Sequence, residues 1–380
     1  MRIISSEDPI NLHRALNGKI AIISKDKLDS KEKLSVYYTP GVGKVSQAIY
    51  EHPERNQDLT WTKNNLAIIS DGSAVLGLGN IGPKAALPVM EGKAMIFKEF
   101  ADIDAVPIVL DVHEPKKIIA AIQAIAPSFG AINLEDIKAP ECFEIEEELK
   151  KTLTVPIMHD DQHGTAVVCL AGLINAMKLT SKSLGSSKIV ITGAGAAGTA
   201  ITDLIHSYSS KTEIVLIDSK GIISKKRKDL DSNKKRLVNI TNPNNLSGGL
   251  SLALKNADIF IGVSRPGILT ETMIGLMNKK PIVFAMSNPI PEIYPKDAIR
   301  AGAYIVATGR SDFPNQINNA LAFPGIFRGA LDNNVNRITK EHELKVAEVI
   351  AKLVKNPTPN NIMPDIFNKE LVKRISKVIT

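Results

Sequence analysis

The segment SKIVITGAGAAGTA, residues 187–200, decides the fold of the C-terminal half of the chain. Its first six residues form a largely apolar run that predicts a buried strand, and the pattern G-x-G-x-x-G follows at 193–198, where a helix is expected to begin. A second predicted strand, residues 213–217, ends at Asp218, 20 residues after Gly198. Strand, glycine loop, helix, strand and acid in this order predict a Rossmann-type unit that binds a dinucleotide.

The loop and the acid also predict how the dinucleotide is held. The first glycine permits a tight turn, the second lets the pyrophosphate approach the backbone, and the third lets helix and strand pack closely. Asp218 is expected to bond the adenosine ribose and to repel a 2′-phosphate, which favours NAD, while Lys220 and the basic residues after it keep NADP open. The expected cofactor contacts are Gly193, Gly195, Ala196, Ala197, Gly198, Asp218, Ser264 and Asn288.

Paired acids follow two predicted strands of the N-terminal half. One strand, residues 131–134, ends in Glu135-Asp136, and another, residues 153–158, ends in the motif HDDQHGT at 159–165. A right-handed strand–helix–strand unit would place both acidic pairs at one edge of a parallel sheet. In open α/β sheets that edge is where ligands bind.

Carboxylates that converge in this way repel one another unless a cation lies between them. Oxygen ligands alone suit Mg²⁺ or Mn²⁺, whereas His159 and His163 would favour zinc only with a third soft ligand. The structural alternative is that Asp160-Asp161 only cap the helix expected over 167–177.

Two further side chains have a simple structural interpretation when each is taken alone. A helix is predicted over 83–100, and Lys93 lies near its middle, where most lysines are solvated. Tyr38 lies at a turn, because Thr39 precedes a proline, and a helix is predicted over 42–49. Tyr38 could simply pack under that helix.

The composition narrows the class of protein. A length of 380 residues favours two domains. With two cysteines, no long apolar run and no signal peptide, a cytoplasmic protein without a membrane span is expected. The net charge of +7 comes partly from the basic runs at 225–228 and 234–236. We interpret them as a solvated loop, not a nucleic-acid surface, because only 4% of the residues are aromatic.

The repeated strand-then-loop pattern predicts an α/β fold with two domains. Residues 1–165 are expected to form an N-terminal catalytic and metal-binding domain, and residues 166–335 an NAD(P)-binding domain of the doubly wound Rossmann type. Residues 336–380, with helices predicted over 341–354 and 364–379, are expected to pack back across both. The active site would then be the cleft between the domains.

Seven ordered motifs resemble the malic enzyme family in its short prokaryotic form. They are YTPGV (38–42), DGSAVLGLGN (71–80), EGKA (91–94), LED (134–136), HDDQHGT (159–165), SNP (287–289) and NNALAFPGIFRGAL (318–331). The resemblance implies an NAD(P)-dependent oxidoreductase that converts L-malate to pyruvate and CO₂ with Mg²⁺ or Mn²⁺.

Carried over position by position, the resemblance implies roles for the site residues. Lys93 is the general base for the malate hydroxyl, Tyr38 is the acid that protonates the enolpyruvate, and Asp160 adjoins the metal. The implied metal ligands are Glu135, Asp136 and Asp161, and the implied substrate contacts are Asn288 and Asn319. A metal beside Lys93 would lower the pKa of its amine, which suits a neutral base near pH 7.

One position departs from the pattern of larger malic enzymes. Ala74 stands where they carry an arginine that pairs with a substrate carboxylate, so Lys98, Arg310 or a lysine of a partner subunit would have to supply the charge. A homodimer is expected, and the short segment before Tyr38 could let this residue reach the site of a neighbouring subunit.

Two other functions stay open at this point. A metal-dependent relative could stop at malate dehydrogenation or at oxaloacetate decarboxylation, and a nucleotide-sensing protein could keep the fold without the chemistry. The presence of Tyr38, Lys93 and all four acids argues against the sensing protein.

Overall fold

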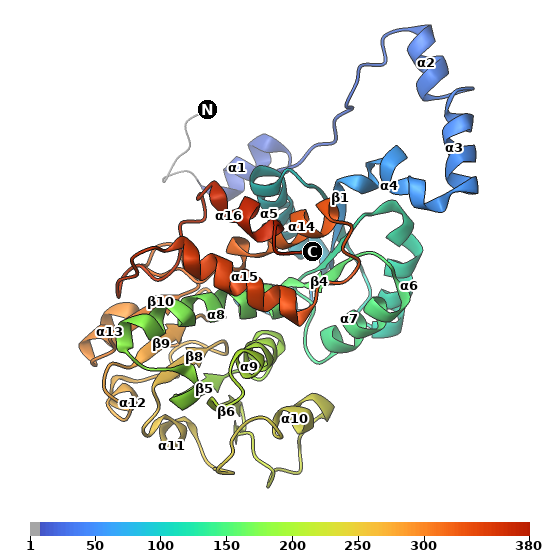
Figure 1. Ribbon diagram of the computed structural model, residues 1–380. Coiled ribbons are helices and arrows are strands. Elements are labelled where there is room, and N and C mark those ends of the chain that lie inside the picture. The colour runs from blue at the N-terminus through green and yellow to red at the C-terminus, as the bar shows by residue number, and fades with distance from the viewer. Residues whose placement is uncertain (1–7) are drawn as a thin grey trace.

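The computed structural model describes residues 8–380 and contains two sheets joined through one long helix (Figure 1). The first seven residues, where no signal peptide is expected, lie outside the described part. The N-terminal sheet is parallel, with the strand order β2-β1-β3-β4. Its elements are β1 (Asn65–Ser70), α5 (Pro83–Ala101), β2 (Asp104–Val109), α6 (Pro115–Ile125), β3 (Ile132–Leu134), α7 (Glu141–Thr152) and β4 (Ile157–His159).

The C-terminal sheet has six strands in the order β10-β9-β8-β5-β6-β7, and only β7 is antiparallel to its neighbour. The strands are β5 (Lys188–Thr192), β6 (Glu213–Asp218), β7 (Gly221–Ile222), β8 (Ile259–Gly262), β9 (Ile282–Ala285) and β10 (Ile305–Thr308). Its helices are α9 (Ala196–Tyr208), α10 (Ser232–Leu237), α11 (Leu250–Leu254), α12 (Glu271–Ile274) and α13 (Pro295–Arg300). The order confirms the predicted α/β fold with a Rossmann-type sheet.

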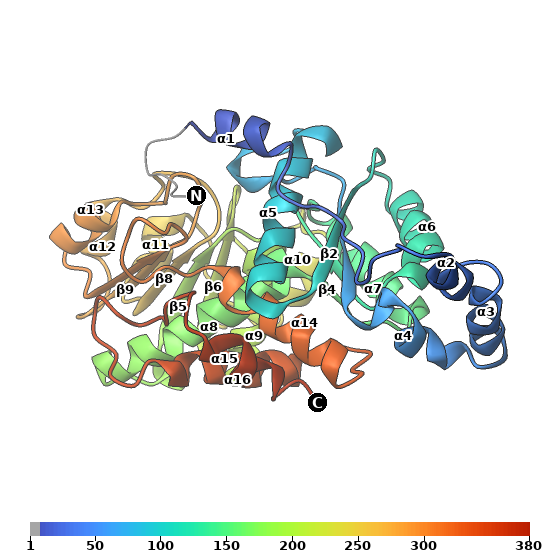
Figure 2. The ribbon, with the colours of Figure 1, turned by 90° about the horizontal axis from the view of Figure 1, so that it is seen from above.

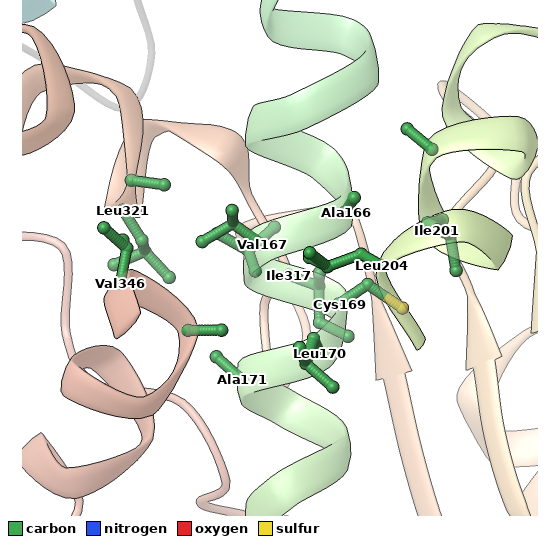
Figure 3. Packing of buried hydrophobic residues seen from close by; sticks show 14 of the residues in the cluster. Ala166, Val167, Cys169, Leu170, Ala171, Ile201, Leu204, Ile317, Leu321 and Val346 are labelled. Atoms are coloured by element: carbon green, nitrogen blue, oxygen red, sulfur yellow. The ribbon is translucent and has the colours of Figure 1, made fainter. Parts of the chain in front are cut away.

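Helix α8 (Asp160–Thr180) connects the two sheets and is buried along most of its length. It packs against α9 on one side and against the C-terminal helix α15 (Lys340–Leu353) on the other. Figure 3 shows Val167 and Ala171 toward Val346, and Leu204 of α9 on the opposite side. One hydrophobic cluster therefore contains residues of both sheets.

Two predicted boundaries are wrong near this connection. Strand β4 is only three residues long because it pairs with the equally short β3, and α8 begins at Asp160 instead of residue 167. Gly164 lies inside this helix and has to be a glycine there, because an added Cβ would lie 1.9 Å from the Oδ1 atom of Asp160. The acidic pair therefore forms the first turn of the helix.

The C-terminal helices cover the junction between the two sheets (Figure 2). Besides α15 they are α14 (Phe323–Asp332) and α16 (Glu370–Ser376). The helix predicted over 364–379 is shorter than expected, because the side chains of Asp365 and Asn368 accept hydrogen bonds from backbone N–H groups and hold turns before α16.

The N-terminal segment forms small helices, α1 (Pro9–Leu16), α2 (Lys31–Tyr37), α3 (Val42–Glu51) and α4 (Asn56–Leu59). Helix α2 was not expected from the polar sequence; Ser30 caps it by accepting a bond from the backbone N–H of Lys33. Figure 1 shows α2 and α3 standing away from the rest of the molecule. Within residues 8–380, no helix combines the length and apolarity needed to cross a membrane.

Candidate active site

Three carboxylates meet where β3 and β4 end. Leu134 pairs with His159 across the two parallel strands, so the residues that follow each strand lie side by side. Glu135, Asp136 and Asp161 each offer an oxygen, and these atoms all lie within 4.8 Å of one another. The backbone N–H of Asp136 donates to Oδ2 of Asp161 at 2.8 Å. The structure thus brings together the two acidic pairs as their positions after the strands predicted.

The electrostatics of this group favour a hard cation. Burial and the charge of Asp161 raise the pKa of Asp136, and burial raises the pKa of Glu135. Oδ2 of Asp136 and Oδ1 of Asp160 are buried and have no hydrogen-bond partner among residues 8–380. An oxygen-only set with unpartnered oxygens fits Mg²⁺ or Mn²⁺. Since no histidine belongs to this set, the geometry does not favour zinc.

Lys93 reaches this group from the middle of α5. Its ammonium lies 2.7 Å from Oε1 of Glu135, contacts Asp160, and lies 4.1 Å from the ring centroid of Phe323. Burial lowers the pKa of Lys93, but the charges of Asp160 and Glu135 raise it above its ordinary value. With these carboxylates alone Lys93 is protonated. The expected neutral amine depends on the charge of a metal.

A cavity of about 960 Å³ extends from the carboxylates to the C-terminal sheet. The predicted site residues that line it are Lys93, Glu135, Asp136, Asp161, Gly195, Ala196, Ala197, Ser264, Asn288 and Asn319. The cavity therefore connects the predicted metal and cofactor residues in one space. Asp160 lies behind it, fully buried against Lys93.

The glycine loop has the tight geometry that a dinucleotide requires. Gly193 adopts φ +103°, and its N–H donates to the carbonyl of Ile217 at 2.8 Å. A Cβ on Gly198 would lie 1.6 Å from the carbonyl oxygen of Gly193. Among residues 8–380, no side chain caps the N-terminus of α9, so its first N–H groups are available to an anion. This cradle fits the pyrophosphate of NAD(P).

Asp218 is already engaged by basic side chains. Arg227 holds it with two bonds of 2.7 and 3.0 Å, and Nζ of Lys234 lies 3.3 Å away. Burial raises the pKa of Asp218, but the bonds from Arg227, from the backbone N–H of Lys220 and from Lys234 together bring it below its ordinary value. The interpretation of the basic runs as a solvated loop is therefore wrong at Arg227 and Lys234, whose side chains are largely buried and bind Asp218, whereas Arg236 is exposed and pairs with Asp203.

Tyr38 lies away from this cavity, and among the predicted cofactor residues Gly193, Gly198 and Asp218 do not line it either. Tyr38 follows α2 on the N-terminal arm, the segment 22–51 that contains α2 and α3. The residue is 67% exposed, and its side chain does not line the cavity. Two suggested partners for a substrate carboxylate are also elsewhere: Lys98 binds Asp102, and Arg310 binds Asp312.

Several residues around the site were missed from the sequence. Lys19 and Lys138 line the cavity, and Glu146 and Glu343 hold His163, which the sequence suggested only as a possible zinc ligand, beside the first turn of α8. Lys138 had a detectable signal, because it stands two residues after the Glu-Asp pair. Glu343 had none, since it is 180 residues from His163 in the sequence.

Comparison with known proteins agrees with the geometry. Residues 17–150 match the malic enzyme N-terminal domain, and residues 162–380 match the malic enzyme NAD binding domain. A bifunctional malic/malolactic enzyme of Bacillus subtilis (strain 168) is 48% identical over 98% of this chain and 92% of its own length. An NAD-dependent malic enzyme of Geobacillus stearothermophilus is 50% identical over 96% of this chain and 76% of its own.

Solved structures give the same result. The crystal structure of the NAD-dependent malic enzyme of Thermotoga maritima superposes with a TM-score of 0.95 at 47% identity, over 98% of this chain and 99% of that one. The chain described here therefore belongs to the malic enzyme family.

Proposed function

We propose that this chain oxidatively decarboxylates L-malate to pyruvate and CO₂ while it reduces NAD⁺ or NADP⁺, as malic enzymes do. The observation that carries the proposal is the single cavity in which Lys93 and three carboxylates face the glycine loop. The N-terminal sheet would supply a base and a cation site to this cavity, and the C-terminal sheet would supply the glycine loop for a hydride acceptor. Such an arrangement suits a reaction that needs all three together.

Glu135, Asp136 and Asp161 would hold Mg²⁺ or Mn²⁺. When bound, the ion supplies positive charge that opposes the carboxylates around Lys93 and polarises the oxygens of the substrate. The backbone at Asp136 is fixed by the protein itself, because it adopts φ +53° and its N–H donates a hydrogen bond to Asp161.

Lys93 would accept the proton of the malate hydroxyl during oxidation at that carbon. Burial and Phe323 keep its amine in place, and Asp160 beside it can share the proton. Asn288 and Asn319 line the same cavity and would orient the substrate through their amides. After CO₂ leaves, the enol of pyruvate needs a proton on carbon, which is the role proposed for Tyr38.

The position of Tyr38 supports a homodimer in which each arm serves the neighbouring site. The arm exposes several apolar side chains; the most exposed are Ile22, Ile23, Leu28, Val36, Tyr37, Tyr38 and Tyr50. Such a patch on a projecting segment is typical of a subunit interface. A second copy of this chain that covers the arm would bring Tyr38 to a cavity.

Mixed dimers test this arrangement. A Tyr38→Phe chain and a Lys93→Ala chain are each expected to be inactive, but a random mixture should regain about a quarter of wild-type activity, because half of the dimers hold one intact site of two. Subunit exchange is checked separately, by co-purification of an untagged chain with an affinity-tagged one, because mixing Tyr38→Phe with wild-type chain gives about half of wild-type activity with or without exchange. No recovery after proven exchange would mean that Tyr38 acts in its own subunit.

The second carboxylate of malate needs a cation, and we propose Lys138. The backbone N–H of Lys138 donates to Oγ of Ser73 at 2.9 Å, and that of Ala74 donates to the carbonyl of Asp136 at 2.9 Å, so these segments are held together at the cavity wall. The ammonium of Lys138 has one acidic neighbour, the partly exposed Glu141 at 3.1 Å. It can therefore turn toward the substrate.

One assay tests the reaction as a whole. Purified protein receives L-malate with NAD⁺ or NADP⁺, with and without Mn²⁺, while reduced cofactor, pyruvate and oxaloacetate are followed. We expect metal-dependent pyruvate in equal amount to reduced cofactor. Accumulation of oxaloacetate without pyruvate would instead favour malate dehydrogenation alone, and pyruvate formed only from added oxaloacetate would favour decarboxylation alone. The cytoplasmic location stays a prediction.

A further inference from the structure

One imidazole joins three helices beside the carboxylate group. His163 belongs to the start of α8, two residues after Asp161. Its Nε2 atom lies 2.8 Å from Glu146 of α7, and its Nδ1 atom lies 2.8 Å from Glu343 of α15. Since both partners are carboxylates, both ring nitrogens donate, and the side chain, which is 20% exposed, is a cation between two buried anions.

Glu146 extends this bridge to the other end of the same helical turn. It accepts the backbone N–H of His159 at 2.9 Å, the amide of Gln162 at 3.3 Å and the ammonium of Lys150 at 2.9 Å. The carboxylate is only 5% exposed. The residues on both sides of Asp160-Asp161, His159 and His163, are therefore anchored to one buried carboxylate.

Helix α15 holds the bridge from the opposite direction. Glu343 is 5% exposed, and its helix is capped by Thr339 and packs along α8. Because a carboxylate of a metal site must keep its direction, small rotations of the first turn of α8 would move Asp161 away from Glu135 and Asp136. The bridge opposes such rotation with charge-assisted bonds to two buried carboxylates, Glu146 and Glu343.

We infer that His163 is a positioning residue which, through Glu146 and Glu343, sets the direction of Asp161 and so makes metal affinity depend on the C-terminal helix α15. The inference rests on the proposed ligand set of Glu135, Asp136 and Asp161. None of the three bridge residues contacts that set directly, so their effect would be on binding geometry and not on the reacting atoms.

The test measures Mn²⁺ binding to the full chain without substrate, from the electron paramagnetic resonance signal of free Mn²⁺. Glu343→Gln and His163→Asn are expected to raise the Mn²⁺ Kd about tenfold or more, as loss of supporting partners does in other metal sites. Glu343→Gln keeps the shape of the side chain, so it remains informative if His163→Asn fails to fold.

His342→Gln is the matched control. His342 is also a buried histidine of α15, but its ring bonds Thr339 and the carbonyl of Thr380, away from the carboxylates. This variant is expected to lower the unfolding temperature without changing the Mn²⁺ Kd. Unchanged Mn²⁺ affinity in both bridge variants, with lowered unfolding temperatures, would show that the bridge is only structural and would overturn the inference.

Asp161→Asn separates this failure from failure of the proposed function. It should abolish Mn²⁺ binding if Asp161 is a ligand. If Asp161→Asn binds Mn²⁺ as wild type does, the ligand set is wrong and the inference falls with it. If only Asp161→Asn loses Mn²⁺, the ligand set stands and the inference about His163 is wrong.

Discussion

The two sheets end at the same cavity, but they present different chemistry to it. The four-stranded sheet ends in side-chain carboxylates that are buried and repel one another, with Lys93 among them. The six-stranded sheet ends in glycines whose backbone N–H groups carry only partial charges. One end therefore needs a cation and can move protons, whereas the other can only hold a ligand. Changes at the first should affect turnover, and changes at the second should affect cofactor affinity.

The largest expected effect is that of Lys93→Ala, which removes the proposed base from the carboxylate end. We expect kcat for malate to fall about a thousandfold, within the range for loss of a general base, while the Kd for the reduced cofactor stays unchanged. Stopped-flow absorbance gives kcat, and quenching of protein fluorescence gives the Kd. Lys98→Ala, on the same helix but exposed, is the control. Full turnover by Lys93→Ala would remove this lysine from the mechanism.

Gly198→Ala tests the glycine loop at the end of the six-stranded sheet. The added Cβ would lie 1.6 Å from the carbonyl oxygen of Gly193, so the loop must open. Overpacking of this kind typically costs 1–3 kcal/mol, and we expect the cofactor Kd to rise about tenfold to a hundredfold. The Mn²⁺ Kd should not change. Gly249→Ala, where a Cβ meets nothing within 4 Å, is the control. If Gly198→Ala weakened Mn²⁺ and cofactor binding equally, the two sheets would not have separate binding tasks.

Lys138→Ala separates substrate binding from metal binding at the carboxylate end. It should raise the KM for malate about tenfold and leave the Mn²⁺ Kd unchanged, because a charge-assisted bond to the substrate is lost but the metal ligands are not. Lys19→Ala tests the other lysine at the cavity wall, whose ammonium already donates to the carbonyl of Pro88. If Lys19→Ala alone raises KM, the roles of the two lysines are reversed.

The smallest expected effect concerns Arg227 beside the glycine loop. Arg227→Ala frees Asp218 to bond the ribose and removes a cation that a 2′-phosphate could use. The ratio of the NADP⁺ Kd to the NAD⁺ Kd should therefore rise several-fold, up to about tenfold, as measured by calorimetry. Arg236→Ala, which loses a similar pair with Asp203, should leave the ratio unchanged. An unchanged ratio in both would make Arg227 structural.

The sequence predicted the elements whose signals are local. In α5, Ala86, Met90, Ala94 and Phe97 recur at helical spacing and are all buried. The position of each acidic pair after a strand was enough to place the carboxylates together, because parallel strands share one edge. These features depend on periodicity and topology, both of which are readable from one chain.

Other features depend on contacts that no local pattern reports. The start of α8 at Asp160 depends on Gly164, whose lack of a side chain leaves space for the carboxylate of Asp160. Arg227 looked like part of a solvated run until its pairing with Asp218 was visible. The bridge through His163 needs Glu343, which only the packing of α15 on α8 brings near. The role proposed for Tyr38 would need a second copy of the chain.

The burial of α8 also has a consequence for how the chain unfolds. Its cluster contains Leu66 and Ile68 of the first sheet together with Ile189 and Ile191 of the second. Neither sheet can lose this helix without exposing the core of the other. The two halves, although they carry separate sheets and separate tasks, should therefore melt as one cooperative unit, with a single calorimetric transition whose van't Hoff and measured enthalpies agree for each subunit.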